Sequence, residues 1–381
     1  MSTATEPSTP HPVRTATKLP FWSAVRTVFG LEMKQRLRGR AWYWMLGVWF
    51  VVIGAIFVLA TGVIGATDNE GGILFDLIVG FVLFFGLLVA PGLSANAING
   101  DRAGGTLAIL QVTLLTPGQL LLGKWLASWV GSLAFLVLSS PFIFWALALG
   151  GVNAQEALVS LLMLAVELGV VCALGVGVSA LAGRPLFSIV STYMLVALLA
   201  VGTLIVFGLS TTLVMEERTT TTSYYTYPED SFDSRGVPEE GAEMECITQT
   251  SQSMIPRTEY IAWMLAANPF VVVADAVPYS VEDLPEPATT AELRAYEPSG
   301  PHYSPGIMET ISQGVRAAQA GPDVDQTCEE YAQALRPLPQ ETPIWPLGLG
   351  VQLVLAGVLL LIGRRRLTMP ARRLAQGTRI A

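Results

Sequence analysis

The sequence predicts an all-α polytopic membrane protein with six transmembrane helices and a mixed extracytoplasmic domain between the fifth and sixth spans. Of the 381 residues, 52% are hydrophobic and only 14% are charged, and the mean hydropathy is +0.51. Such values are typical of chains that cross a membrane several times. Six apolar runs each reach about 20 residues, the length needed to cross the hydrocarbon core of a bilayer.

The predicted spans form two blocks. Segment 42–214 holds the first five, and segment 343–363 holds the sixth. An aromatic belt of Trp42, Tyr43 and Trp44 marks the entry to the first span. Pro91 is expected to kink the last turns of the second span, because proline removes a helical hydrogen bond. The expected limits of the six spans are 42–66, 72–95, 120–149, 156–182, 186–214 and 344–363.

Charge is divided sharply along the chain. Segment 215–342 contains 22 acidic and 6 basic residues, a net charge of −16, whereas the remainder contains 8 acidic and 16 basic residues, a net charge of +8. We expect the protein to lie in the cell (plasma) membrane. Because basic residues collect on the cytoplasmic side of membrane proteins, both termini are expected in the cytoplasm. The basic residues cluster at membrane edges, which does not indicate nucleic-acid binding.

The N-terminal part is expected to be a disordered cytoplasmic tail, 1–19, followed by an interfacial helix, 20–41. Arg26 and Arg36 fall inside the apolar stripe of this helix and are expected to reach out to lipid headgroups. A basic tail, 364–381, follows the last span. The stripe consists of Trp22, Val25, Phe29, Met33 and Leu37.

A short polar segment, 100–118, separates the second and third spans. Asp101 and Arg102 begin it, and Gly104 and Gly105 break the chain. Thr106 is expected to cap a helix of roughly ten residues that Thr116, Pro117 and Gly118 end. A helix of that length is too short to cross a bilayer, so we expect it to lie at the cytoplasmic surface.

The order of residues in this segment resembles the cytoplasmic coupling helix of the type-2 ABC exporter permeases. That family has an acidic residue and Arg, then G-T-L, T-P and G-K before the next span, and more often has Glu where this chain has Asp. The positions that carry the resemblance are Asp101, Arg102, Gly105, Thr106, Leu107, Thr116, Pro117, Gly123 and Lys124. The basic segment before the first span and the six-span layout also resemble this family.

The resemblance implies the transmembrane subunit of an ABC exporter, with two permease chains, identical or related, paired above two ATPase subunits. The coupling residues Asp101, Arg102, Gly105, Thr106, Leu107, Thr116 and Pro117 would transmit motion from the ATPases. Segment 20–41 would be the connecting helix that touches the ATPase, although a simple membrane anchor explains it equally well. Its expected contact residues are Glu32, Lys34, Arg36 and Arg38.

The sequence contains no arrangement that predicts an enzyme. Gly118 to Lys124 has the spacing of a phosphate-binding loop, but Trp125 stands where that loop needs Ser or Thr to hold magnesium. The two histidines, His11 and His302, are far apart, and no metal-ligand or nucleophile pattern occurs. We therefore expect no metal or cofactor on this chain, with ATP and Mg²⁺ bound by the partner ATPase.

Glu167 lies near the middle of the fourth predicted span, where charged side chains are costly. Either it belongs to the translocation path, as a substrate contact or as a charge lining the cavity of the dimer, or it is a protonated acid hydrogen-bonded to a neighbouring helix.

The extracytoplasmic domain, 215–342, contains an apolar segment, 261–277, that is interrupted by Asn268 and Pro269. A seventh span there would place the arginine-rich tail outside, so we expect a re-entrant segment; a core helix of the domain is the alternative. The domain opens with a strand-prone Thr/Tyr run, and segments 307–320 and 324–335 are expected to be helical.

Cys246 and Cys328 both fall in this domain, where an oxidising compartment permits disulfides. We predict that they pair and close a loop worth roughly 4–5 kcal/mol in chain entropy. Two unpaired thiols are the alternative. For the whole chain, the alternative function is a membrane-anchored sensor or channel-like protein without ATP coupling.

Overall fold

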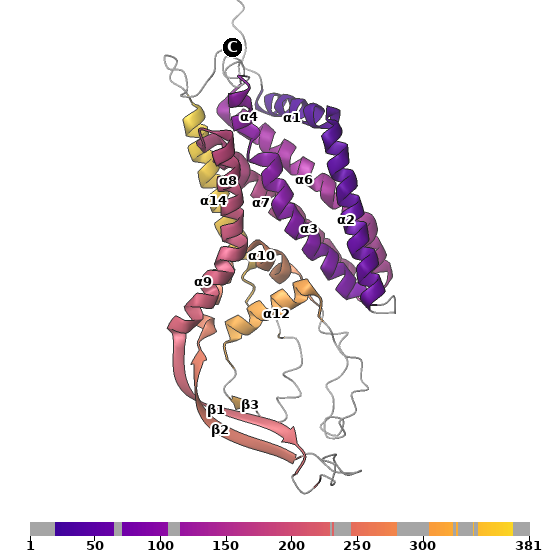
Figure 1. The fold of residues 1–381 in the computed structure, drawn as a ribbon. Helices are drawn as coiled ribbons and strands as arrows, with labels where there is room; N and C mark the ends of the chain where they lie inside the picture. The colour runs from indigo at the N-terminus through magenta and orange to yellow at the C-terminus, as the bar shows by residue number, and fades with distance from the viewer. Residues whose placement is uncertain are drawn as a thin grey trace, which may run out of the picture.

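The computed structural model describes residues 20–64, 71–105, 115–228, 231, 245–279, 305–322, 325–326, 338 and 342–368. It shows a helical bundle at one end and a long, curved β-hairpin at the other (Figure 1). Within the described residues, six helical stretches are long and apolar enough to cross a membrane, so the six predicted spans are confirmed as candidate spans. The fold therefore fits a multi-pass membrane protein.

The helices follow the apolar runs closely. The second candidate span consists of α3 and α4, joined by a turn at Ala95 and Asn96, and the fifth consists of α8, a π-helical turn, α9 and a 3₁₀ turn. The bounds are α1 Phe21–Arg38, α2 Arg40–Ile64, α3 Gly71–Ser94, α4 Ala97–Ala103, α6 Pro117–Ala148, α7 Ala154–Leu181, α8 Pro185–Ala197, η1 Leu198–Gly202, α9 Thr203–Ser210, η2 Thr211–Val214 and α14 Trp345–Leu367.

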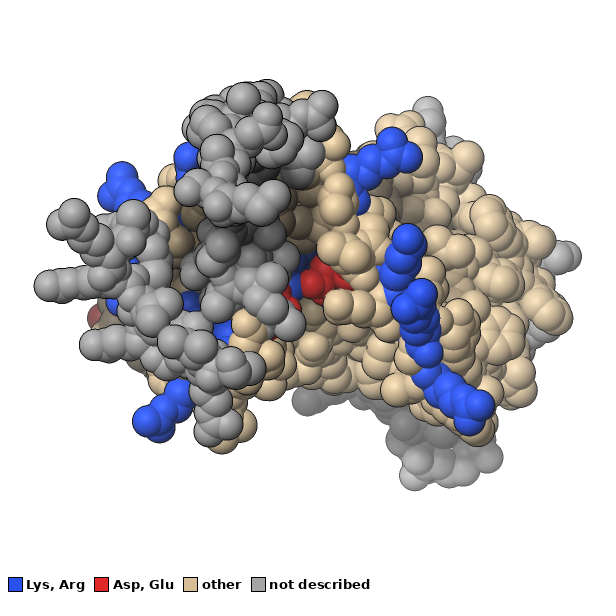
Figure 2. Space-filling view, turned by 90° about the horizontal axis from the view of Figure 1, so that it is seen from above, with Lys and Arg blue, Asp and Glu red and all other residues tan. Residues whose placement is uncertain are grey.

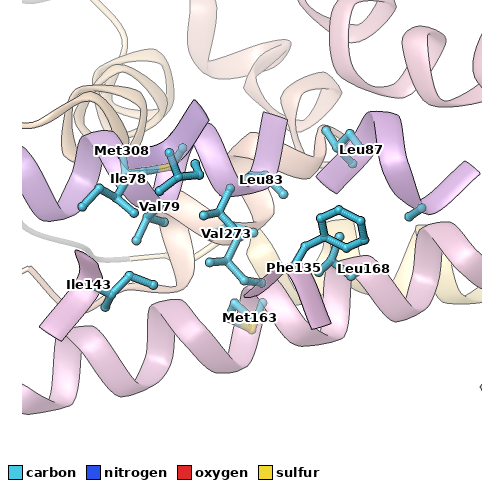
Figure 3. Packing of buried hydrophobic residues seen from close by; sticks show 14 of the residues in the cluster. Ile78, Val79, Leu83, Leu87, Phe135, Ile143, Met163, Leu168, Val273 and Met308 are labelled. Carbon is cyan, nitrogen blue, oxygen red and sulfur yellow. The ribbon is translucent and has the colours of Figure 1, made fainter. Parts of the chain in front are cut away.

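Helices α3 and α7 form the centre of the bundle. Figure 3 shows side chains from α3, α6 and α7 meeting Val273 and Met308, which come from two short helices outside the spans. By contrast, α2, α8 and α9 keep much of their apolar surface exposed, including Val58, Val63 and Phe187. A bundle with apolar residues on its outside is suited to a lipid environment.

Segment 261–277 is not a continuous helix. It consists of the 3₁₀ turn η5 (Ala262–Leu265) and, after a break at Asn268, the short helix α10 (Pro269–Ala276). The Asn268 side chain accepts from Phe270 N and donates to Ala200 O in the π-helical turn. The predicted break at Asn268–Pro269 is therefore confirmed, and the irregular backbone is covered by other helices.

The region between the fifth and sixth spans is mixed in structure, as predicted. Strands β1 (Met215–Thr226) and β2 (Glu245–Pro256) pair antiparallel, and β3 (Asp325–Gln326) pairs parallel to β1. The helix predicted over 307–320 is confirmed as α12 (Ile307–Ala320). The helix predicted over 324–335 is wrong at Asp325 and Gln326, because β1 offers these residues a backbone pairing partner.

Two side-chain carboxylates tie this region to the bundle. Asp76 of α3 accepts from the backbone N–H of Glu309 in the first turn of α12, at 2.9 Å. Asp275 of α10 accepts from the N–H groups of Ile344 and Trp345, where α14 begins. Each carboxylate satisfies N–H groups that a helix start leaves free.

Candidate functional site

The candidate site is the junction where α1 crosses the end of the bundle (Figure 1) and packs against the first turns of α6. Val28 of α1 and Ile98 of α4 belong to one buried cluster with Leu120 and Leu121 of α6. Lys124 of α6 lies at the centre of the junction, with a side chain only 2% exposed. Its Nζ lies 2.8 Å from Asp101 Oδ2 of α4 and forms a second ion pair with Glu32 Oε1 of α1. One lysine therefore joins three elements. Burial of a lysine requires such partners, because an unpaired buried charge is strongly unfavourable.

Gly123 explains how α1 comes close enough to form this junction. A Cβ atom at Gly123 would lie 2.7 Å from Val28 Cβ and 3.1 Å from the Val25 carbonyl oxygen, both in α1. These distances are shorter than van der Waals contact allows, so only glycine permits this approach. The adjacent residues Gly123 and Lys124 thus act together, the first admitting α1 and the second pairing with it.

Arg36 holds the end of α3 against α1. Its Nη2 donates to Leu93 O and to Ser128 Oγ, each at 3.0 Å, and Ser128 Oγ donates to the same carbonyl at 3.1 Å. Leu93 is near the C-terminus of α3, where carbonyl groups lack helical partners and attract cations. Burial lowers the pKa of the Arg36 guanidinium, an effect that the Glu32 carboxylate opposes.

The expectation that Arg36 reaches out to lipid headgroups is therefore wrong. The arginine turns inward because Gly131 of α6 leaves space for it: a Cβ there would lie 2.7 Å from Arg36 Nη1. The apolar stripe of α1 is also only partly turned inward. Val25 is buried, together with Ala24 and Val28, whereas Trp22 and Leu37 are exposed, as in a helix lying at a lipid surface.

Helix α4 is fastened on its other side to α7 and α8. Ser179 Oγ of α7 accepts from Ile98 N and Asn99 N at 3.0 and 3.2 Å, and Ser188 Oγ of α8 donates to Ala95 O. Arg102 donates to Asn99 Oδ1 and to Ala182 O, the carbonyl of the residue that caps α7. A displacement of α4 would therefore act on α6 through Lys124 and on α7 through Arg102.

The chain leaves α4 through Gly104 and Gly105, and the φ of +74° at Gly105 favours glycine. Residues 106–114 lie outside the described residues, so the predicted coupling helix and its residues Thr106 and Leu107 are not placed. Thr116 and Pro117, expected to end that helix, lie at the start of α6. Thr116 forms a capping box with Gln119, and Pro117 is the first helical residue.

Of the residues predicted for the site, the structure brings Glu32, Arg36, Asp101 and Arg102 together around the junction. Lys34 and Arg38 are exposed instead, and Figure 2 shows Lys and Arg side chains spread over this end of the molecule. The sequence prediction did not include Lys124, Ser128, Ser179 or Ser188 among the site residues, although Lys124 is one of the positions that carry the family resemblance. A lysine within an apolar run was a signal, because it needs a counter-charge from another element.

Glu167 lies at the centre of α7 and is 1% exposed. Gln352 of α14 is its polar neighbour, and the Gln352 amide donates from Nε2 to Ala267 O at 3.1 Å. In this conformation Glu167 is enclosed by protein, and its role in a translocation path stays a prediction.

Cys246 lies in β2, opposite Tyr225 of β1. Cys328 lies outside the described residues, so the pairing of Cys246 with Cys328 stays a prediction.

Among the residues that the structure places, no group of three or more His, Cys, Asp or Glu is arranged to hold a metal ion. No protein-family model matches this chain, and no curated protein matches it.

Proposed function

We propose that this chain is the transmembrane permease subunit of an ATP-driven ABC transporter that works as an exporter. The observation that carries the proposal is the buried Lys124, which joins Glu32 of α1 to Asp101 of α4. These acidic residues belong to the two segments whose sequence resembles the ATPase-contacting parts of the type-2 exporter permeases.

Force applied to the junction would spread along defined contacts. A partner pressing on α1 and on the chain after α4 would move Asp101 and Glu32, and with them Lys124 of α6. The same movement would pull on α7 through Arg102 and Ala182. Coupling requires a connected element that both sites can bias, and this junction fits that requirement.

The partners follow from the same proposal. Two ATPase subunits would bind ATP and Mg²⁺, because this chain has no complete phosphate-binding loop. A second permease chain, identical or related, would complete the translocation path. The junction end, with its exposed basic residues, would face the cytoplasm and anionic lipid, and the β-hairpin would lie outside.

Affinity isolation tests this proposal directly. The full chain, purified from its native membrane in lipid nanodiscs, is expected to bring down a protein with a complete nucleotide-binding site, identified by mass spectrometry. Asp101→Lys is expected to reduce its recovery while leaving the chain folded and inserted. Absence of any nucleotide-binding protein from the wild-type sample would favour a sensor or channel without ATP coupling.

A further inference from the structure

Glu167 is surrounded by three closely packed elements. α7 carries it, α14 carries its neighbour Gln352, and the broken segment 261–276 supplies Ala267. α14 approaches both other elements closely: a Cβ at Gly348 would lie 1.9 Å from Ala266 O, and one at Gly177 would lie 2.7 Å from Leu359 Cβ. Glu167 itself is 1% exposed in this conformation.

Among the described residues, three hydrogen-bond acceptors at this place lack a hydrogen bond of good geometry. Among the described residues, neither carboxylate oxygen of Glu167 has a hydrogen-bond partner, and neither does Gln352 Oε1. Donation from Nε2 to Ala267 O fixes the Gln352 amide, because a flipped amide would place two acceptor oxygens together. Buried acceptors without donors are rare in folded proteins, which indicates a donor that the heavy atoms do not reveal.

The surroundings offer Glu167 no cation. From α6, the indole N–H groups of Trp125 and Trp129 donate to Gly169 O and Ala165 O of α7. From the broken segment, the Asn268 amide donates to Ala200 O and Thr203 Oγ1. Among the described residues, burial is the largest influence on the charge of Glu167, the nearby Gln352 amide partly offsets it, and no Lys or Arg contributes.

Cys172 on the same helix and Arg36 of α1 are both engaged elsewhere. Cys172, one turn and a half along α7, is a neutral thiol directed to Ser132 and Ala90, and Arg36 interacts with Cys172 and Glu32. Neither group balances a charge on Glu167, so an ionised Glu167 would be a lone buried anion.

We propose that Glu167 is a proton-binding site. In this conformation its carboxyl group is neutral and donates a hydrogen bond to Gln352 Oε1, which completes a chain from Glu167 through Gln352 to Ala267. The proton comes from water and returns to water when α14 and the broken segment separate from α7. Proton binding therefore stabilises the closed packing of these three elements, and alkaline pH weakens it. This inference does not depend on the proposed function.

Infrared spectroscopy of the full chain in lipid nanodiscs tests whether the Glu167 carboxyl group carries a proton. At neutral pH, the wild-type spectrum minus that of Glu167→Gln is expected to contain a protonated-carboxyl band. Asp76 is also buried, but it is present in both samples, so its absorption cancels in the difference spectrum. A difference spectrum with only the bands of an ionised carboxylate would overturn the proposal.

A second variant keeps Glu167 and tests its acceptor. Gln352→Met is expected to shift the carboxyl band to the higher frequency of a free acid, whereas Glu217→Gln in exposed β1 leaves it in place. An unchanged band in Gln352→Met would overturn the hydrogen bond. Thermal unfolding adds a third reading: the wild type is expected to lose stability from neutral to alkaline pH by more than Glu167→Gln does, and equal losses would contradict the stabilising role.

Discussion

Lys124 Nζ lies 2.8 Å from Asp101 Oδ2, although the intervening chain leaves one apolar helix and enters the next. The same ammonium group pairs with Glu32 of the crossing helix α1. These contacts join α1, the end of the second span and the start of the third, and the first predictions concern their energetics.

Lys124→Met is expected to destabilise the protein by about 2 kcal/mol. Removing one partner of a fully buried pair costs roughly 3–5 kcal/mol, but here both carboxylates are about one-fifth exposed, which lowers the cost. Denaturant unfolding in nanodiscs measures it. The control is Lys34→Met, an exposed position on α1, where a change within about 0.5 kcal/mol is expected. Equal effects at the two positions would contradict the buried junction.

Gly123→Ala is expected to separate α1 from α6, because its new methyl group would meet Val28. We expect a loss of about 1–3 kcal/mol, the usual cost of overpacking. Val28→Ala added to it is expected to restore part of the loss. Gly30→Ala provides a matched control, because nothing lies within 4 Å of a Cβ there and alanine favours a helix. If Gly123→Ala unfolds like the wild type, the close approach of α1 is wrong.

Orientation is tested by cysteine labelling with a membrane-impermeant reagent. Glu217→Cys, exposed on β1, is expected to react in intact cells. Arg365→Cys, exposed in the last turn of α14, is expected to react only after permeabilisation, because the proposed topology places the basic end in the cytoplasm. Labelling of the unmodified chain gives the background signal from its own cysteines. Labelling of Arg365→Cys from outside would reverse the proposed topology.

Acid is expected to loosen the root of the β-hairpin. A hydrogen bond from Arg257 holds the pKa of the Glu216 carboxyl below its usual 4.5. A carboxyl group with a lowered pKa in the folded state contributes stability above its unfolded value, and this contribution is lost as the pH falls through the lowered pKa. The protection of amides near Glu216 from hydrogen exchange, corrected for the intrinsic exchange rate at each pH, should therefore fall in acid.

Arg257→Gln is expected to remove the stability that the hydrogen bond to Glu216 contributes. Exchange near Glu216 is then expected to be faster than in the wild type already at neutral pH. Glu217→Gln, next to Glu216 on the exposed strand, should keep the wild-type pH dependence. The same acid response in wild type and Arg257→Gln would show that another group causes it.

The spans were predictable because a long apolar run carries its own signal. The break at Asn268–Pro269 was also predictable, since proline and an asparagine cap are local features. By contrast, β2 was missed: most of its residues are exposed, so it lacks the alternation of apolar and polar residues that a half-buried strand shows.

The direction of Arg36 could not be predicted from α1 alone. Its inward turn depends on the space left by Gly131 and on the free carbonyl of Leu93, which belong to other helices. The role of Lys124 was similarly hidden, because its partners lie 92 and 23 positions away in the sequence. In both cases the outcome depends on contacts between elements that are distant in the sequence, and a local sequence pattern does not predict such contacts.

ATP turnover by the chain reconstituted with the proposed ATPase partner tests the central claim most directly. Asp101→Lys is expected to lower transport-coupled turnover several-fold, because it places a second cation beside Lys124. The exchanged pair, Asp101→Lys with Lys124→Asp, restores opposite charges and is expected to recover a large part of that turnover. Wild-type turnover in Asp101→Lys, or no recovery in a folded exchanged pair, would contradict coupling through this junction.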